Sequence, residues 1–358
     1  MKHLFLSVFL LLTSLFAFAQ DNIVYMDAAS LPLYGKLREA GGPRYRRFVP
    51  ELEVQLRPPV WKHGCCSAGL YLRFRTDAPS ISAKWTNTGK HMPHMTDCGT
   101  GGLDLYAYID GAWRFVGSGF NWGAIGKEHE RRLVGDMEVK MREYMLYLSL
   151  YDEVKSLELG VPEGYSIEEP QLESPVSECP VVMYGTSILQ GGCASRPGMA
   201  HTNIIARRLN RTVINLGFSG NAHLDYEVAR EMAKRTDASV FVLDYVPNCT
   251  AGMIDEKGET FFRILRDACP DIPVVFVENP VFPHGVADMK TAEGVRAKND
   301  AQKALYKRLK KAGEKKLYYV EAAKMTDSED FVDGVHMTDK GMEHYADLLT
   351  PLLKKLVK

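Results

Sequence analysis

The chain has 358 residues, and its 44 Lys and Arg residues nearly balance its 45 Asp and Glu residues, for a formal net charge of -1. This balance excludes a strongly basic protein and gives no reason to expect nucleic acid or an anionic membrane surface as a partner. Apolar residues make up 46% and charged residues 25%, which is ordinary for a folded protein and excludes extensive disorder. The length is sufficient for two domains.

The first nineteen residues predict an export signal. Lys2 and His3 precede an apolar run over 4–18, and residues 17–19 read Ala-Phe-Ala, a typical cleavage site. The run is shorter than the ~20 apolar residues that span a bilayer, so the pattern favours cleavage over an anchor and stable membrane insertion. We therefore expect a mature chain that begins at Gln20 and acts in the periplasm or outside the cell.

Seven cysteines follow the signal: Cys65, Cys66, Cys98, Cys179, Cys193, Cys249 and Cys269. An odd number leaves at least one of them unpaired, and their spacing forms neither a CxxC pair nor a zinc signature. The first three share the N-terminal region, so one disulfide is expected there if the compartment is oxidising. The sequence leaves the pairing open.

Residues 20–175 predict an all-β domain. Alternating or β-rich runs, typical of strands in a jelly-roll-like antiparallel sandwich, occupy 70–75, 103–109, 113–116, 142–150 and 157–161. Asp110-Gly111 separates two of these runs, and this dipeptide is a strong signal for a tight β-hairpin.

Residues 176–358 predict an α/β domain, which follows a Glu-, Ser- and Pro-rich linker at 168–175. Strands and helices alternate after the linker, and the strands are almost continuously apolar, as in a parallel sheet covered on both faces. We expect a doubly wound, mostly parallel five-stranded sheet. Its strands are predicted at 181–184, 212–216, 240–245, 274–277 and 317–320, and its helices at 203–209, 226–234, 260–267, 296–311 and 341–356.

The turn after the first of these strands carries a candidate nucleophile. In open α/β sheets, ligands bind beyond the carboxyl ends of the strands. Gly185-Thr186-Ser187 lies at such an end, and a serine on a tight strand-to-helix turn exposes its hydroxyl. The G-x-S-x-G elbow is absent, because residue 189 is leucine. A helix cap is the alternative role for Ser187.

The turn before the last helix carries a candidate base. Serine is a poor nucleophile until a neutral imidazole accepts its proton, and a carboxylate must fix the tautomer of that imidazole. Asp333 and His336, three residues apart on one loop, supply both groups. The alternative is that Asp333 makes a turn with Gly334 and that His336 only leads into the helix.

Two further turns carry hydrogen-bond donors. Gly220 follows the second strand of the predicted sheet, where a glycine lets a backbone N–H approach an oxyanion closely. Asn248 follows the third strand, and its side-chain amide is a second suitable donor. Both residues are also common in ordinary turns, which is the alternative.

Taken in chain order, these turns resemble the conserved blocks of the SGNH/GDSL hydrolase family across residues 179–356. The blocks match residues 185–188, Gly220, Asn248, and Asp333 with His336. The chain departs from the family pattern at Thr186, where aspartate is usual, and around Asn248, where the flanking glycine and aspartate are missing.

The resemblance implies a catalytic triad of Ser187, His336 and Asp333. It also implies an oxyanion hole formed by the N–H groups of Ser187 and Gly220 and the side chain of Asn248. Such an enzyme needs neither a metal nor an organic cofactor.

Residues 102–106 read Gly-Leu-Asp-Leu-Tyr. This segment is similar to the GxDLY signature of a β-sandwich domain that precedes SGNH domains in some bacterial proteins. Similar two-domain layouts occur among carbohydrate acetylesterases.

A metal site is the other chemistry that the sequence raises. His91 and His94, with Asp97 and Cys98 nearby, offer ligand types that metals use, but their spacing fits no compact template. We therefore expect residues 90–100 to form a loop tip that borders the active-site cleft.

Together these patterns predict an exported serine esterase that removes small acyl groups, with acetyl as the first candidate, from small-molecule or glycan esters. A lipase, thioesterase or lysophospholipase is the enzymatic alternative. A carbohydrate-binding protein with an inactive hydrolase domain is the alternative from another class. The sequence does not determine the oligomeric state.

Overall fold

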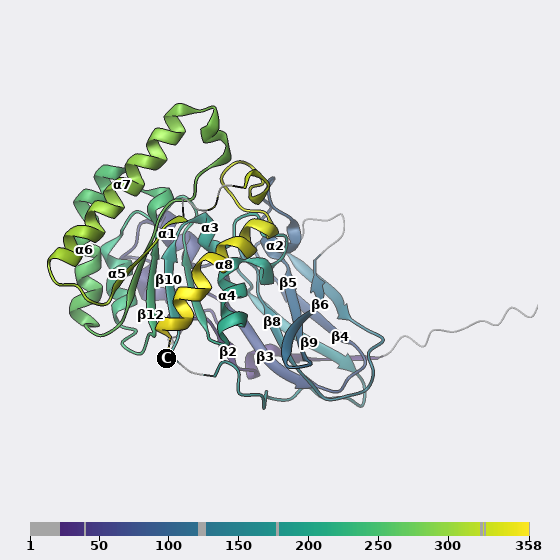
Figure 1. The fold of residues 1–358 in the computed structure, drawn as a ribbon. Coiled ribbons are helices and arrows are strands. Elements are labelled where there is room, and N and C mark those ends of the chain that lie inside the picture. The colour runs from purple at the N-terminus through teal and green to yellow at the C-terminus, as the bar shows by residue number, and fades with distance from the viewer. Residues whose placement is uncertain are drawn as a thin grey trace, which may run out of the picture.

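A computed structural model describes residues 22–38, 41–120, 127–176, 179–322, 325 and 327–357 of the chain. The predicted export signal at 1–19 lies outside these residues. An antiparallel β-region comes first, and an α/β region follows it and packs beside it (Figure 1). Within the described part of the chain, no helix has the length and apolar character needed to cross a membrane.

The N-terminal region is a sandwich of two antiparallel sheets, as predicted. Its strands are β1 (Ile23–Asp27), β2 (Leu33–Tyr34), β3 (Tyr71–Thr76), β4 (Ile81–Thr86), β5 (Leu103–Ile109), β6 (Ala112–Gly119), β7 (Glu128–Val134), β8 (Arg142–Tyr147) and β9 (Ser156–Pro162). One sheet has the order β2-β3-β8-β5-β6 and the other the order β1-β9-β4-β7. Phe74, Leu105 and Leu146 from the first sheet share one core cluster with Trp85 and Leu159 from the second, because alternate residues of each strand face inward.

The predicted hairpin joins β5 and β6. Ile109 lies opposite Ala112, and the two residues between them, Asp110 and Gly111, have φ angles of 50° and 76°. Positive φ at both central residues is the signature of a type I′ turn, whose twist matches that of the flanking strands. The Asp-Gly signal is therefore confirmed.

Two short helices interrupt the region that was expected to be all β: α1 (Pro58–Gly64) and α2 (Asp97–Gly101). Val60 of α1, with Phe48 and Leu52 before it, packs into a core cluster of the α/β region rather than into the sandwich. A Cβ at Gly64 would lie 2.1 Å from the ring of Phe48, so only glycine permits this contact. Helices of two turns or fewer give too little periodicity to be recognised in the sequence.

The second region contains the predicted five-stranded parallel sheet. Its strands are β10 (Val181–Gly185), β11 (Val213–Gly217), β12 (Val240–Asp244), β13 (Val274–Val277) and β14 (Leu317–Val320), in the order β11-β10-β12-β13-β14. Every adjacent pair is parallel. Along β10, Val182 and Tyr184 face one core cluster, while Val181 and Met183 face the other. Both faces of the sheet are therefore buried, which explains the continuous apolar runs.

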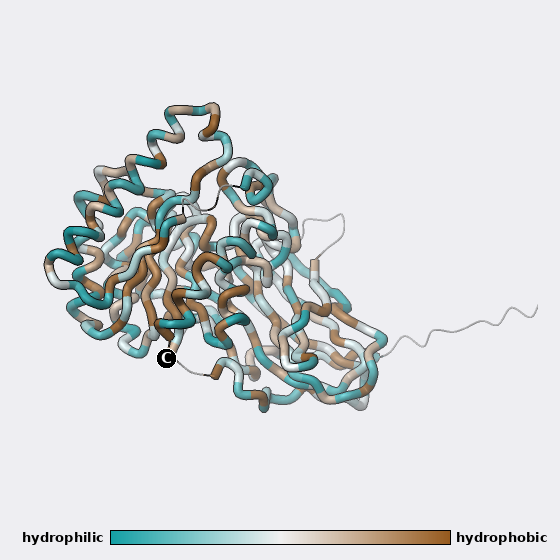
Figure 2. The backbone as a smooth tube through the Cα atoms, in the orientation of Figure 1, coloured by the Kyte–Doolittle hydropathy of each residue, from teal (hydrophilic) through white to brown (hydrophobic). Residues whose placement is uncertain are grey.

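Helices cover both faces of this sheet. They are α3 (Ser187–Gln190), α4 (His201–Leu209), α5 (Tyr226–Ala233), α6 (Ala251–Ala268), α7 (Met289–Lys311) and α8 (Asp339–Leu356). Ile205 of α4 and Leu349 of α8 pack on one face, and Val228, Phe261 and Leu305 of α5, α6 and α7 pack on the other. Figure 1 shows α5, α6 and α7 on the side away from the sandwich. In Figure 2 the apolar residues concentrate on the strands, whereas the outer helix α7 is largely hydrophilic.

Helices α6 and α7 begin well before the residues that the sequence predicted. The Thr250 side chain accepts a hydrogen bond from the Met253 N–H and starts α6 at Ala251 rather than at 260. Asp288 caps α7 in the same way through the Thr291 N–H, so this helix starts at Met289 rather than at 296. The N-caps, rather than apolar periodicity, define where both helices begin.

The disulfide expected in the N-terminal region does not form. All seven cysteines lie within the described residues, and no disulfide joins any two of them. The Cys66 Sγ donates to the carbonyl of Tyr151 at 3.3 Å. The Cys98 thiol instead lies near Ser118 and Asp104. The thiols of Cys66 and Cys98 therefore lie in different surroundings. The third cysteine of this region, Cys65, is next to Cys66 in the chain.

A buried arginine joins the N-terminal region to the parallel sheet. The Arg47 side chain is 1% exposed and donates to four carbonyl groups, those of Cys66 (3.1 Å), His63, Asn215 (2.8 Å) and Gly217 (3.0 Å). Two of these carbonyls precede β3, and the other two lie on β11. One guanidinium thus satisfies backbone acceptors on both sides of the contact, which offsets the cost of burying its charge.

The GxDLY segment forms a second connection. Asp104, which is fully buried, accepts hydrogen bonds from Arg196 (2.6 Å) and from the Gly198 N–H (2.8 Å), and Arg196 also contacts the Tyr106 hydroxyl (2.6 Å). Burial raises the pKa of Asp104 to about 6, although the charge of Arg196 opposes the rise. The signature therefore fixes the segment that follows α3 against the sandwich.

Removal of the cation should destabilise the protein in a pH-dependent way. In Arg196→Met the buried Asp104 loses its countercharge, so its folded-state pKa rises further above the unfolded value. An acidic group whose folded-state pKa is raised in this way makes the folded protein less stable as the pH rises from the unfolded-state pKa to the folded-state pKa. We expect a loss of about 3 kcal/mol in the free energy of unfolding at pH 8, and a clearly smaller loss at pH 5.

Urea unfolding at both pH values measures this difference. Arg114→Met is the matched control, because Arg114 is exposed on β6, and it should change the free energy by no more than about 0.5 kcal/mol. An equal loss at pH 5 and pH 8 in Arg196→Met would contradict the role given to Asp104.

Candidate active site

Ser187 is the first residue of α3, directly beyond the carboxyl end of β10. The Thr186 hydroxyl accepts from the Ile188 N–H at 3.3 Å and so caps the helix. Thr186 therefore performs a task open to aspartate, which is usual at this position in the family. The helix ends after one turn at Gly191, whose φ is 110°. This short turn holds the Ser187 side chain at the strand end, where it is 6% exposed.

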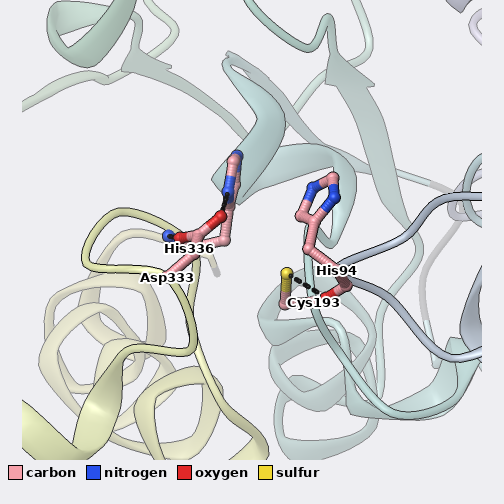
Figure 3. Close-up of side chains that lie close together, drawn as sticks. All are labelled: His94, Cys193, Asp333 and His336. Atoms are coloured by element: carbon pink, nitrogen blue, oxygen red, sulfur yellow. Dashed lines mark hydrogen bonds and ion pairs between the residues drawn. The ribbon is translucent and has the colours of Figure 1, made fainter.

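The structure brings Ser187, His336 and Asp333 into one hydrogen-bonded row. The His336 Nε2 lies 2.8 Å from the Ser187 Oγ, and its Nδ1 lies 2.7 Å from the Asp333 Oδ2. Figure 3 shows the Asp333 carboxylate directly beside the His336 ring. This geometry allows a neutral imidazole to accept the serine proton while the carboxylate holds the opposite nitrogen.

The Asp333 carboxylate is stabilised in its charged form. Burial alone would raise the pKa of Asp333, but hydrogen bonds from the His336 N–H and ring and from the Val335 N–H outweigh this effect and lower the pKa to about 2. The two backbone bonds measure 2.7 and 3.0 Å and end on the Asp333 Oδ1. The other oxygen, Oδ2, therefore faces the imidazole.

The loop that carries Asp333 and His336 is anchored at its base. The Val332 N–H donates to the His336 carbonyl at 2.8 Å, so the loop closes on itself. Asp339, at the start of α8, accepts from the N–H and hydroxyl of Ser195 at 2.9 and 2.5 Å. Because Ser195 lies on the segment after α3, this contact fixes the loop with His336 relative to Ser187.

The predicted oxyanion donors lie on neighbouring strand ends. Gly185 pairs with Gly217 of β11 and with Asp244 of β12, so the turns with Ser187, Gly220 and Asn248 start from the same level of the sheet. Among the described residues, the N–H groups of Ser187 and Gly220 have no protein acceptor. Both N–H groups are therefore available to a ligand.

Asn248 is held beside the Gly220 turn. Its Oδ1 accepts from the Ala222 N–H at 3.3 Å, which leaves its amide NH₂ available as a donor. The Cys249 Sγ contacts the Ala222 carbonyl at 3.3 Å. These two bonds tie the turn after β12 to the turn after β11, without the glycine and aspartate that usually flank this asparagine.

Two residues that contact the Ser187–His336–Asp333 row were not predicted from the sequence. The Tyr151 hydroxyl, contributed by the segment after β8, donates to the Ser187 carbonyl at 3.0 Å. Gly192 packs so closely that a Cβ there would lie 2.9 Å from the His336 Cδ2 and 3.0 Å from the Tyr151 hydroxyl. A tyrosine after a β-strand reads as a core residue, and a glycine after a short helix reads as a turn.

The loop over 90–96 borders the site as predicted, but α2 replaces its last part. The His94 ring lies 5.3 Å from the His336 ring, centroid to centroid, and the Cys193 Sγ contacts the His94 carbonyl at 3.1 Å (Figure 3). His91 instead binds Asp97 at 2.9 Å on the exposed side of the loop. The four residues His91, His94, Asp97 and Cys98 therefore do not form a single metal site.

Cys193 does not compete with Ser187 as a nucleophile. Burial raises the pKa of Cys193 to about 12, and the negative charge of Asp333 adds to the rise. The thiol is therefore protonated at neutral pH, and the thiolate is the reactive form of cysteine.

A hollow of about 490 Å³ lies near the histidine loop. Phe282, on its wall, packs edge-on against Phe331 of that loop, and a Cβ at Gly334 would touch the ring of His284 at 2.8 Å. The hollow mixes apolar and charged residues: Glu278, Val281, Phe282, Gly285, Val286, Thr291, Ala292, Val295, Arg296, Asn299, Asp300, Lys303 and Glu321.

Two family models match the chain. The GDSL-like lipase/acylhydrolase family matches residues 178–354, and the N-terminus of SGNH-hydrolase-type esterases, named for its GxDLY motif, matches residues 23–167. Both resemblances noted in the sequence are therefore confirmed. No curated protein sequence matches the chain.

Solved structures with the same fold cover nearly the whole chain. A protein from Bacteroides ovatus, assigned as a GDSL-like lipase, is 36% identical with a TM-score of 0.88 and covers 94% of this chain and 98% of that chain. The salicylyl-acyltransferase SsfX3 of a tetracycline biosynthetic pathway is 18% identical with a TM-score of 0.73 and covers 94% and 99%. Est2A, an acetyl xylan esterase from the rumen bacterium Butyrivibrio proteoclasticus, is 11% identical with a TM-score of 0.57 and covers 93% and 98%.

The likeness to SsfX3 and to Est2A concerns the fold alone. The likeness to the Bacteroides ovatus protein extends to the sequence over almost the full length of both chains. On the matches to both family models and to this relative, the chain belongs to the GDSL-like lipase/acylhydrolase family and is an ester hydrolase.

Proposed function

We propose that the protein is a serine esterase that removes small acyl groups, acetyl first, from carbohydrate esters. The single observation that carries the proposal is the row from the Ser187 Oγ through the His336 ring to the Asp333 carboxylate, with contacts of 2.8 and 2.7 Å. A row in this order lets a hydroxyl lose its proton at neutral pH.

In the proposed mechanism, the Ser187 Oγ attacks the acyl carbon while the His336 Nε2 takes its proton. The N–H groups of Ser187 and Gly220 and the Asn248 amide stabilise the negative charge that develops on the acyl oxygen. His336 then returns the proton to the leaving alcohol, and an acyl-serine remains. Water loses a proton to His336, attacks this ester and releases the acid, and the proton returns to Ser187.

The shared fold supports an acetylated glycan as the substrate. Est2A, which has this fold, is an acetyl xylan esterase. The wall of the hollow near the histidine loop carries Glu278, Arg296, Asp300 and Lys303, which can bind sugar hydroxyls, on a surface that is mostly apolar.

We also propose that the protein is exported and loses its first nineteen residues. The apolar run over 4–18 and the Ala-Phe-Ala site support this step. The intact mass of protein secreted by a bacterial host would place the new N-terminus at Gln20.

Ser187→Ala should abolish turnover of p-nitrophenyl acetate, butyrate and octanoate. Loss of a triad member costs several orders of magnitude in kcat, on the order of 10⁴-fold or more. Initial rates for the three esters measure both the loss and the chain-length preference of the wild type, which we expect to favour acetate. Ser156→Ala, a substitution on the exposed surface of the sandwich, should retain the full rate.

Other outcomes of this series point to the alternatives. A preference for octanoate would indicate a lipid substrate. Equal slow rates for the wild type and Ser187→Ala, together with binding of acetylated xylan by both proteins, would indicate a carbohydrate-binding protein instead of an enzyme.

Asp333→Asn should lower kcat about 10⁴-fold, because the amide no longer selects the imidazole tautomer that accepts the serine proton.

The effect of Asp333→Asn on the free energy of unfolding should depend on pH. The lowered pKa of Asp333 stabilises the folded state above the unfolded value near 4, and this contribution is lost as the pH falls through about 2. Unfolding of both proteins by urea at pH 7, 4 and 2 tests this, and a difference that persists unchanged at pH 2 would contradict it.

Gly192→Ala should impair catalysis more than stability. The added Cβ would lie 2.9 Å from both the His336 Cδ2 and the Ser187 carbonyl, so the imidazole must shift away from the hydroxyl. Because a misplacement of about 1 Å can cost 10²-fold in rate, we expect a fall in kcat of about that size with a small change in KM. Gly294→Ala on α7, where a Cβ meets no atom within 4 Å, is the control and should leave both constants unchanged.

A further inference from the structure

Four metal-ligating side chains from three segments meet beside the catalytic row. His94 comes from the loop before α2, Cys193 from the segment after α3, and Asp333 and His336 from the loop before α8. One possible ligand atom from each residue lies within 4.8 Å of the corresponding atom of every other residue. Figure 3 shows the His94 and His336 rings on either side of the Cys193 thiol. Within the described residues, this is the one such group of three or more His, Cys, Asp or Glu side chains.

The chemistry of these donors selects a particular class of cation. Two imidazoles, one thiol and one carboxylate are the ligand types that Zn²⁺ binds in tetrahedral sites, whereas Mg²⁺ and Ca²⁺ require oxygen ligands. Zinc bonds of 2.0–2.3 Å place tetrahedral ligand atoms about 3.3–3.8 Å apart. The widest pair of the group, up to 4.8 Å apart, must therefore contract by about 1 Å, which requires side-chain rotation on binding.

Two of the four residues have no role in the proposed ester chemistry. Neither ring nitrogen of His94 makes a hydrogen bond to a described residue, so the unprotonated nitrogen can donate its lone pair to a ligand. The Cys193 thiol is held against the carbonyl of His94 at 3.1 Å, which keeps these two donors together. The Asp333 carboxylate supplies negative charge on the opposite side.

We propose that Zn²⁺ binds between His94, Cys193, Asp333 and His336 and thereby reversibly inhibits the enzyme. The S–H bond of Cys193 breaks on binding, its proton passes to water, and the sulfur electron pair forms the bond to the metal. A ring nitrogen of His336 donates its lone pair to zinc and is withdrawn from the catalytic row. Ser187 then has no base, and no oxidant or reductant is needed.

A test that does not depend on turnover uses Co²⁺ as a spectroscopic substitute for zinc in the purified, reduced protein. The wild type should develop a thiolate-to-cobalt charge-transfer band, and equimolar Zn²⁺ should remove it. Cys193→Ser should lose the band, and His94→Ala should weaken binding at least about tenfold. Cys179→Ser and His91→Ala, which alter a cysteine and a histidine outside the group, should behave like the wild type.

The inhibitory part of the proposal rests on the proposed esterase function and is tested separately. Zn²⁺ should inhibit hydrolysis of p-nitrophenyl acetate by the wild type, and EDTA should restore it. The zinc concentration for half-inhibition should rise at least about tenfold in His94→Ala and Cys193→Ser, each compared with its own zinc-free rate.

Each outcome of the two tests has one meaning. Equal zinc sensitivity in the wild type, His94→Ala and Cys193→Ser would overturn the site, because His336 alone would then account for inhibition. Absence of the cobalt band in the wild type would also overturn it. A protein that binds cobalt as described but hydrolyses none of the esters would contradict the esterase function and leave the metal site standing.

Discussion

The parallel register of β10 with β11 and β12 is the constraint on which the site depends. It sets Gly185 level with Gly217 and Asp244, so three consecutive strand-to-helix turns open at the same edge of the sheet. A shift of one residue in this register would move Ser187 away from the turns with Gly220 and Asn248 and turn every side chain of the strand to the opposite face. Burial of both faces of the sheet makes such a shift costly.

The N-terminal sandwich contributes residues that contact this edge of the parallel sheet directly. Tyr151 contacts the carbonyl of Ser187, the Asp104–Arg196 pair fixes the segment after α3, and the loop with His94 faces the imidazole of His336. The positions of Ser187 and His336 are therefore set partly by residues outside the parallel sheet. A sandwich that only supported the enzyme from a distance would make none of these contacts.

Much of the fold and of the candidate site was predictable from local signals. Asp110-Gly111 indicated the hairpin, and continuous apolar runs indicated the parallel strands. Ser187 was proposed at the end of a predicted strand, and Asp333 and His336 on the loop before the last predicted helix. These are signals of short range, carried by residues a few positions apart.

The features that were missed depend on contacts between distant residues. The Tyr151 hydroxyl and Gly192 acquire meaning only when the sandwich meets α3, and His94 joins Cys193 across 99 positions of the chain. The metal ligands considered in the sequence were neighbours along the chain, whereas those that the structure assembles come from three segments. Helix α1 was missed because its apolar side faces the other region, so its pattern does not match the sandwich around it.

Arg47 has a consequence for how this architecture changes over evolution. Its guanidinium occupies carbonyl groups on both sides of the contact, including those of Asn215 and Gly217 on β11. A gene fusion that exchanged the first half for an unrelated module would leave these acceptors buried without donors, a cost of several kcal/mol at the strand beside Ser187. Changes within the loops leave these bonds in place, so they cost less stability than the exchange of a whole module.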